Sequence, residues 1–227
     1  YSDGNLSLPE LAEIAKKLNY EYIAVCDHSQ SAKYAHGLTI NRLREQIKEI
    51  DLLNQKIQGF KILKGIEVDI LADGQLDLPD SILKELDIVI AAIHSGFRKS
   101  VTERIIRALE NPWVTIIAHP SGRLISKREG YEVDLEKVLV KAKEKGKVLE
   151  LNAYYDRLDL NEFYLKKAKE LGIKISIGTD THYANGFQMM RFGVGIARRA
   201  WLEKDDILNC LNYQNLLKKL KQMQPKN

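Results

Sequence analysis

Short apolar runs that alternate with helical segments are the feature that most constrains the fold of this chain. The apolar runs lie at residues 22–26, 60–70, 88–93, 114–118, 147–151 and 175–178. The intervening segments space their apolar residues as helices do, with start and stop signals such as the Ser7/Glu10 capping box and the terminal Gly146 and Gly172. Nearly continuous apolar strands are buried on both faces, which favours an α/β fold with a parallel sheet wrapped in helices.

The same alternation predicts how the chain is organised. No Gly/Ser-rich linker, repeat or low-complexity block divides it, so residues 1–227 are interpreted as a single domain. Six strands can be counted from Tyr22 onward, but only a loop and a helix precede them. A strand should precede that helix in a repeating β-α unit. The sequence therefore predicts that a first strand lies upstream of Tyr1 and is truncated here. A last helix is expected from Asp205.

Composition narrows the class of protein. A hydrophobic content of 44% and a charged content of 29% over 227 residues are ordinary for a globular protein. No apolar run approaches 18 residues, which argues against a transmembrane helix. Cys26 and Cys210 make no disulfide framework, and Cys26 is expected to be buried, so a reducing, cytoplasmic location is expected. The net charge of +4 is compatible with a polyanionic partner but does not require one.

Potential metal ligands stand at the carboxyl ends of the predicted strands. They are His28, Glu67, His94, His119, Asp180 and His182. In a closed parallel barrel all these ends meet on one face, which is where such barrels build their active sites. Four of the five histidines occupy strand ends, and the fifth, His36, is expected to be an ordinary surface residue.

Each of these residues also has a plainer interpretation. Asp180 could cap a helix, His182 could be exposed, and Glu67 could form an ion pair with Lys61 or Lys64. Taken together, however, those interpretations leave buried carboxylates and imidazoles without partners, which is costly. Divalent metal ions would supply the partners, and imidazole with carboxylate ligands suits Zn, Mn or Fe. The ligands are too many for one ion, so we expect two or three ions that share Glu67.

Two arginines could orient a phosphate at the same face. Arg123 follows the run at 114–118 and Arg157 follows the run at 147–151. A guanidinium can bind two phosphate oxygens at once, although both residues could equally form surface salt bridges. Together with the metal ligands they predict metal-dependent phosphoester hydrolysis. A metal-dependent amidohydrolase is the competing barrel enzyme, but it usually carries a bridging Lys where this chain has Glu67.

An ordered set of short stretches resembles the polymerase and histidinol phosphatase (PHP) domain, and more closely the C-terminal PHP domain of bacterial family X DNA polymerases. The stretches are residues 1–4 (YSDG), 27–29 (DHS), 65–69 (GIEVD), 92–95 (AIHS), 118–123 (AHPSGR), 152–153 (NA), 180–182 (DTH) and 190–195 (MRFGVG). Each is weak alone, and the set covers nearly the whole chain. Residues 119–123 and 191–195 indicate the family X subgroup.

The resemblance implies a distorted TIM-like (β/α)7 barrel with a trinuclear metal site. It adds Asp3 as a ligand: Asp3, His28 and His182 would hold one ion. A second ion would lie on Glu67, His94 and His119, and the remaining one on Asp180 and Glu67 with two further ligands. The family supplies those two from a His-x-His pair just before the Tyr1 stretch, which this chain lacks.

By resemblance, Glu67, His94, His119 and Asp180 are the catalytic residues. The substrate would be a DNA 3′ end, cleaved by 3′–5′ exonuclease activity, with a polymerase domain upstream in the same chain. The alternatives are a free-standing phosphatase of the histidinol phosphatase type and a non-catalytic PHP module that braces a polymerase. Non-catalytic PHP domains lose their ligands, whereas seven are retained here.

Overall fold

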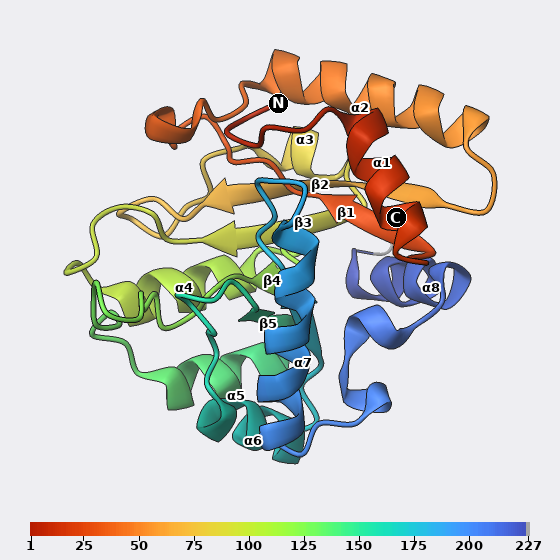
Figure 1. Ribbon diagram of the computed structural model, residues 1–227. Coiled ribbons are helices and arrows are strands. Elements are labelled where there is room, and N and C mark those ends of the chain that lie inside the picture. The colour runs from red at the N-terminus through yellow and green to blue at the C-terminus, as the bar shows by residue number, and fades with distance from the viewer. Residues whose placement is uncertain (226–227) are drawn as a thin grey trace.

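The computed structural model describes residues 1–225 and contains one six-stranded parallel sheet whose strand order follows the chain (Figure 1). The strands are β1 (Tyr22–Val25), β2 (Lys61–Asp69), β3 (Ile88–Ala92), β4 (Ile116–Ile117), β5 (Val148–Asn152) and β6 (Ile175–Gly178). The sheet curls into a partial barrel, and within residues 1–225 no ladder joins β1 to β6. The predicted class, a distorted α/β TIM-like barrel with parallel strands, is confirmed.

Helices cover the outside of the curled sheet. They are α1 (Leu8–Lys17), α2 (Ile40–Lys56), α3 (Asp80–Leu83), α4 (Val101–Glu110), α5 (Leu135–Lys145), α6 (Glu162–Glu170), α7 (Met190–Arg199) and α8 (Tyr213–Met223). Most are amphipathic and place their apolar face on the sheet, as the spacing predicts. Leu216 and Leu220 of α8 instead pack with Leu63, Ile88 and Ile116 and close the end where the strands begin. None of the helices within residues 1–225 has both the length and the apolar character needed to cross a membrane.

The alternation of side chains along each strand explains why the polar residues meet. Leu63 of β2 faces the barrel interior, and Glu67 lies four residues further on the same face. Ile88 and Ile90 of β3 lie an even number of residues before His94, which follows the strand, so all three side chains point to the same face. The interior is therefore apolar where the strands begin and polar where they end.

The end of the chain differs from the prediction of a helix from Asp205. Residues Lys204–Asp206 and Leu208–Cys210 form two short 3-10 turns, and the helix begins only at Tyr213, capped by Asn212. The segment between them is held in an extended path by contacts with β6, which is distant in sequence. Ile207 bridges to Ile175, and the Asn209 side chain accepts from Ile177 N at 2.9 Å and donates to Ile177 O at 2.8 Å. This segment thus covers part of the outer edge of β6.

Two other local expectations need correction. The strand predicted at 114–118 pairs only over Ile116–Ile117. Ser100, Val101, Thr102 and Glu103 have the spacing of a capped helix start, and α4 does begin at Val101, but Ser100 has a left-handed backbone with φ of 43° and makes no side-chain cap.

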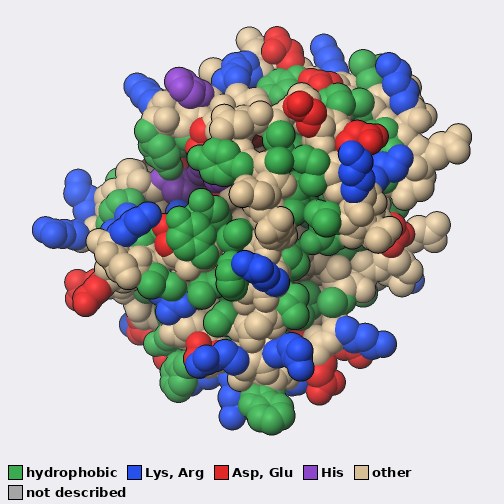
Figure 2. Space-filling model, in the orientation of Figure 1, with side chains coloured by type: hydrophobic (Ala, Val, Ile, Leu, Met, Phe, Trp, Pro, Cys, Tyr) green, Lys and Arg blue, Asp and Glu red, His purple; other side chains and the backbone are tan. Residues whose placement is uncertain are grey.

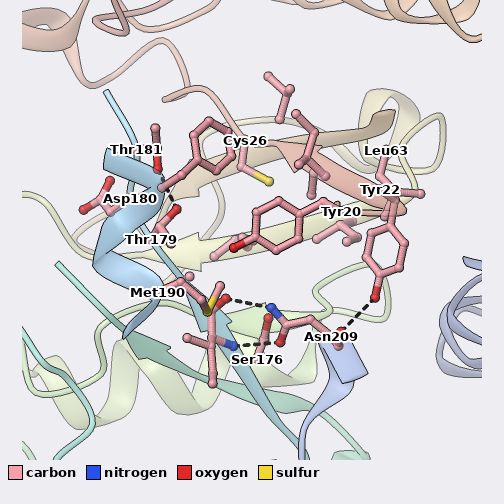
Figure 3. A pocket seen from close by; sticks show the side chains of 18 of the residues that line it. Tyr20, Tyr22, Cys26, Leu63, Ser176, Thr179, Asp180, Thr181, Met190 and Asn209 are labelled. Carbon is pink, nitrogen blue, oxygen red and sulfur yellow. Dashed lines mark hydrogen bonds between the residues drawn. The ribbon is translucent and has the colours of Figure 1, made fainter. Parts of the chain in front are cut away.

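A cavity of about 1080 Å³ opens between β1 and β6. Figure 3 shows Tyr20, Tyr22 and Cys26 on one side and Ser176, Thr179 and Asn209 on the other. Cys26 is partly buried against this cavity rather than enclosed in the core. The polar ends of the strands form one part of its lining, where Asp180 is labelled.

Candidate metal centre

The seven predicted ligands lie in one connected cluster at the carboxyl ends of the strands, with the Glu67 carboxylate at its centre. His119 Nε2 is 3.1 Å and His94 Nε2 is 3.4 Å from its Oε1, while His28 Nδ1 is 3.3 Å from its Oε2. Backbone pairing sets this arrangement, because Glu67 N donates to Asp27 O and Ser29 N donates to Glu67 O. The β1–β2 pairing therefore continues past β1 and brings His28 beside Glu67.

A second group surrounds Asp3. Its Oδ2 lies 3.5 Å from His182 Nε2 and 3.9 Å from His28 Nε2. The segment that carries Asp3 is tied to the barrel, since Ser2 N and Oγ both donate to Asp27 Oδ1. Asp3 is thus positioned by contacts with residues far away in sequence.

Asp180 lies on the β6 side of the cluster. Asn152 Nδ2 donates to its Oδ2 at 3.2 Å, and Arg157 Nε is 3.6 Å from the same oxygen. Within residues 1–225, three-residue groups able to hold an ion are Asp3–His28–His182 and His28–Glu67–His94. The first is the set that the resemblance implies. In the second, His28 stands in place of His119, whose Nε2 atom faces Glu67.

The donor set fits divalent metal ions. The Nδ1 atom of His94 faces Asp69 Oδ1 at 2.5 Å, and that of His182 faces the Asp180 carbonyl oxygen at 2.7 Å. Those oxygens can only accept, so Nδ1 carries the proton in both rings and each Nε2 lone pair faces a carboxylate. His28 Nδ1 and His119 Nδ1 are buried without a hydrogen-bond partner. Acceptors that face acceptors need a cation between them.

The electrostatics of the cluster lead to the same conclusion. Burial opposes a charge on His94, yet Glu67 and Asp69 raise its pKa to about 10. Asp3, followed by Asp180, raises the pKa of His182 to about 9 against its partial burial. Burial would raise the pKa of Glu67, but the surrounding imidazoles hold it well below its usual value. The cluster therefore has a strong affinity for positive charge, which ions could satisfy in place of protons.

Asp69 is a functional candidate that the sequence analysis did not single out. Asp69 is buried, and its carboxylate accepts from Ser31 Oγ at 2.5 Å and faces His94 Nδ1 at the same distance. Carboxylates that orient a ligating imidazole in this way commonly set metal affinity. The sequence could have indicated Asp69, because residues two apart in a strand point to the same face and Asp69 is therefore on the face that carries Glu67.

Asp69→Asn is expected to weaken Mn²⁺ binding by about 10- to 100-fold, because the neutral amide no longer fixes the Nδ1 proton of His94. Isothermal titration of the metal-free protein with Mn²⁺ measures this. Asp73→Asn is the matched control, since Asp73 is exposed in the turn after β2. Equal affinity in both variants would contradict the role of Asp69.

A clamp of two residues, Arg123 and Asp159, joins the loops that follow β4 and β5. Arg123 donates through Nε to Arg157 O at 2.7 Å and through a terminal nitrogen to Leu158 O. Asp159, fully buried, accepts from Ser121 N and Gly122 N in return. Two donors of Arg123 are thus hydrogen-bonded to backbone carbonyls. The Arg157 side chain instead lies beside Asp180, and its Nη1 atom is buried without a hydrogen-bond partner.

The structure also tests two other expectations: an ion pair of Glu67 with Lys61 or Lys64, and a surface position for His36. Lys64 pairs with Asp51 and Lys61 Nζ donates to Asn54 O, so neither is the partner of Glu67. His36 is exposed in a loop, as expected.

Comparison with known proteins identifies relatives of this chain. The chain is 46% identical over 219 residues to the DNA polymerase/3′-5′ exonuclease PolX of Bacillus subtilis, which covers 95% of the chain but only 38% of PolX. It is 37% identical over 218 residues to a probable phosphatase of Thermoanaerobacter pseudethanolicus, covering 89% of the chain and 83% of that protein. No family model matches the chain.

Among solved structures, a histidinol phosphate phosphatase from Lactococcus lactis, crystallised with Zn, L-histidinol and phosphate, has a similar fold. The TM-score is 0.61 at 15% identity, over 89% of this chain and 91% of that one. Fold and site together define an α/β barrel with a His- and carboxylate-rich centre at the carboxyl ends of its strands. The chain belongs to the polymerase and histidinol phosphatase (PHP) family.

Proposed function

We propose that the chain is a metal-dependent phosphoesterase that acts on DNA 3′ ends as a 3′–5′ exonuclease. The observation that carries the proposal is the convergence of three imidazoles on the partly buried carboxylate of Glu67, with Asp3 and His182 alongside. The similarity to PolX supports DNA as the substrate. A polymerase domain elsewhere in a longer chain is part of the same proposal, since the matched region spans 38% of PolX.

In this proposal each residue has a stated role. Two or three divalent ions, of Zn, Mn or Fe, supply Lewis acidity toward phosphoryl oxygens and lower the pKa of water when bound. The chain holds them with Asp3, His28, Glu67, His94, His119, Asp180 and His182. Of these, Glu67, His94, His119 and Asp180 surround the reacting phosphate. Arg157 binds a non-bridging oxygen, because its Nη1 lacks a partner and its Nε faces Asp180.

A phosphatase acting on a small phosphomonoester is the second candidate. The probable phosphatases, which share 37% identity over most of their length, favour it. Hydrolysis of a single-stranded oligonucleotide and of L-histidinol phosphate, measured side by side with Mn²⁺, tests both functions. Faster hydrolysis of the oligonucleotide supports the exonuclease, and hydrolysis of the monoester alone contradicts it. Failure to hydrolyse either would favour the non-catalytic module.

Arg123→Ala is expected to raise the KM for an oligonucleotide and lower kcat without loss of bound metal, because the clamp no longer holds the loop of Arg157. Arg157→Ala should reduce kcat/KM about 10- to 100-fold, as expected for a charged hydrogen bond to phosphate. If Arg123 acts through Arg157, the double variant is no worse than Arg157→Ala alone.

Steady-state kinetics on the two single variants and the double variant, with metal content by mass spectrometry, checks this cycle. Additive losses would mean that Arg123 contacts phosphate itself. A loss of metal in Arg123→Ala would mean that it acts through the structure of the metal centre.

A further inference from the structure

An exposed tyrosine stands at the edge of the metal centre. Tyr34 lies in the 3-10 turn Lys33–Ala35, in the loop after β1, and is 68% exposed. Its ring centroid lies 6.0 Å from the His28 ring and 6.4 Å from the His94 ring. The turn is anchored by buried Ala32 and Ala35, so the hydrophobic core does not require this ring. The aromatic face is therefore available to a ligand next to the metal centre.

Positive charge lies on the loop that follows His94. Arg98 and Lys99 are exposed there, and no carboxylate of residues 1–225 pairs with either. Figure 2 shows His side chains within a hollow bordered by hydrophobic side chains, with Lys and Arg side chains projecting at the nearby edge of the molecule. An aromatic face together with unpaired cations is the combination that binds single-stranded nucleic acid.

Resting on the proposed function, we infer that Tyr34 stacks on an unpaired base next to the scissile phosphate, while Arg98 and Lys99 bind the phosphate backbone that leads away. The substrate class is then a single-stranded DNA end. Inside a duplex both faces of a base are covered by its neighbours, whereas every base of an unpaired end can turn a face toward the ring. Stacking tolerates any sequence because every base has a π face.

Fluorescence anisotropy with two short single-stranded oligonucleotides tests the inference. One ends in an ordinary 3′ nucleotide and the other in a 3′ abasic nucleotide. Both carry phosphorothioate linkages at the 3′ end, which resist hydrolysis, and both are titrated with protein in Mn²⁺. Tyr34→Ala should weaken binding of the ordinary end about tenfold and of the abasic end less than about twofold. Tyr34→Phe and Tyr34→Trp should retain binding, because both keep an aromatic face.

The matched control is Trp201→Ala, since Trp201 is 74% exposed beyond the far end of α7, about 15 Å along that helix from Met190. It should bind both oligonucleotides as the wild type does. The Arg98→Gln/Lys99→Gln variant should reduce the slope of log Kd against log salt by about 1.4, as two lost phosphate contacts predict.

The outcomes separate this inference from the proposed function. Equal losses of Tyr34→Ala on the ordinary and abasic ends would overturn base stacking. Hydrolysis of a phosphomonoester without oligonucleotide binding would overturn the single-strand surface and leave the phosphoesterase. Base-dependent binding without hydrolysis of any ester would support the surface and overturn the proposed function.

Discussion

Replacing Glu67 with Gln is expected to reduce phosphodiesterase activity by about 10³-fold or more, a larger loss than any single His→Ala variant causes. Glu67 lies within 3.5 Å of three imidazoles, whereas the His119 ring has one carboxylate, that of Glu67, at its Nε2 atom. An amide keeps the shape of the side chain but removes the negative charge shared by neighbouring ions. Metal binding and catalysis should therefore fail together.

The measurement is the rate on an oligonucleotide at saturating Mn²⁺, together with Mn²⁺ titration of the metal-free protein. His94→Ala and His119→Ala give the scale for the loss of one neutral ligand. Glu13→Gln is the control, because Glu13 is exposed on α1. A rate near that of the wild type in Glu67→Gln would end the shared-ligand interpretation.

Much of the fold could be predicted because its signals are local. A buried parallel strand is recognised from its apolar run, and a polar residue at its end stands out against that run. Once the strands are known to be parallel, their ends must meet, so His94 and His119 can be placed together without a structure. Their ring centroids lie 5.3 Å apart. Asp3 was found only by resemblance, because its place depends on the hydrogen bonds of Ser2 to Asp27.

What could not be predicted depends on contacts between distant loops. Arg123 is predicted as a phosphate ligand from the sequence, and the structure adds a contact that the sequence does not indicate: two of its donors meet the carbonyls of Arg157 and Leu158, 34 and 35 residues away. Asp159 follows no strand directly, so nothing in the sequence marks it as the other half of the clamp. The Asn209 side chain likewise makes the two hydrogen bonds to Ile177 that a neighbouring strand would make. The spacing of apolar residues does not indicate such a contact.

Asn209 changes one expectation about the incomplete barrel. Because no ladder joins β1 to β6 within residues 1–225, the sheet has two edges, at β1 and β6. The β6 edge is partly covered, because Asn209 pairs with both backbone groups of Ile177 and Ile207 bridges to Ile175. In the part of the chain that the structure describes, only β2 pairs with β1 as a strand. The β1 edge and the cavity beside it are therefore where an added strand would gain most.

Extending the chain upstream of Tyr1 by a segment that adds one parallel strand and a His-x-His pair is expected to raise both the melting temperature and the nuclease rate. The strand would fill the cavity of about 1080 Å³ between β1 and β6 and pair with β1. The two imidazoles would complete the ligands around Asp180. Since metal that binds only the folded protein stabilises it, strand and metal should act together. Thermal unfolding with and without Mn²⁺, and the Mn²⁺-dependent nuclease rate, compare the two chains.

Two variants separate the contributions of strand and metal. Changing both histidines of the added pair to Ala should keep the gain in melting temperature without metal but abolish the gain in rate. Asn209→Ala should lower the melting temperature of the 227-residue chain by several degrees, and that of the extended chain less, because the added strand takes over the β6 edge. If the extended chain gains neither melting temperature nor rate, the prediction of a further strand beside β1 is wrong.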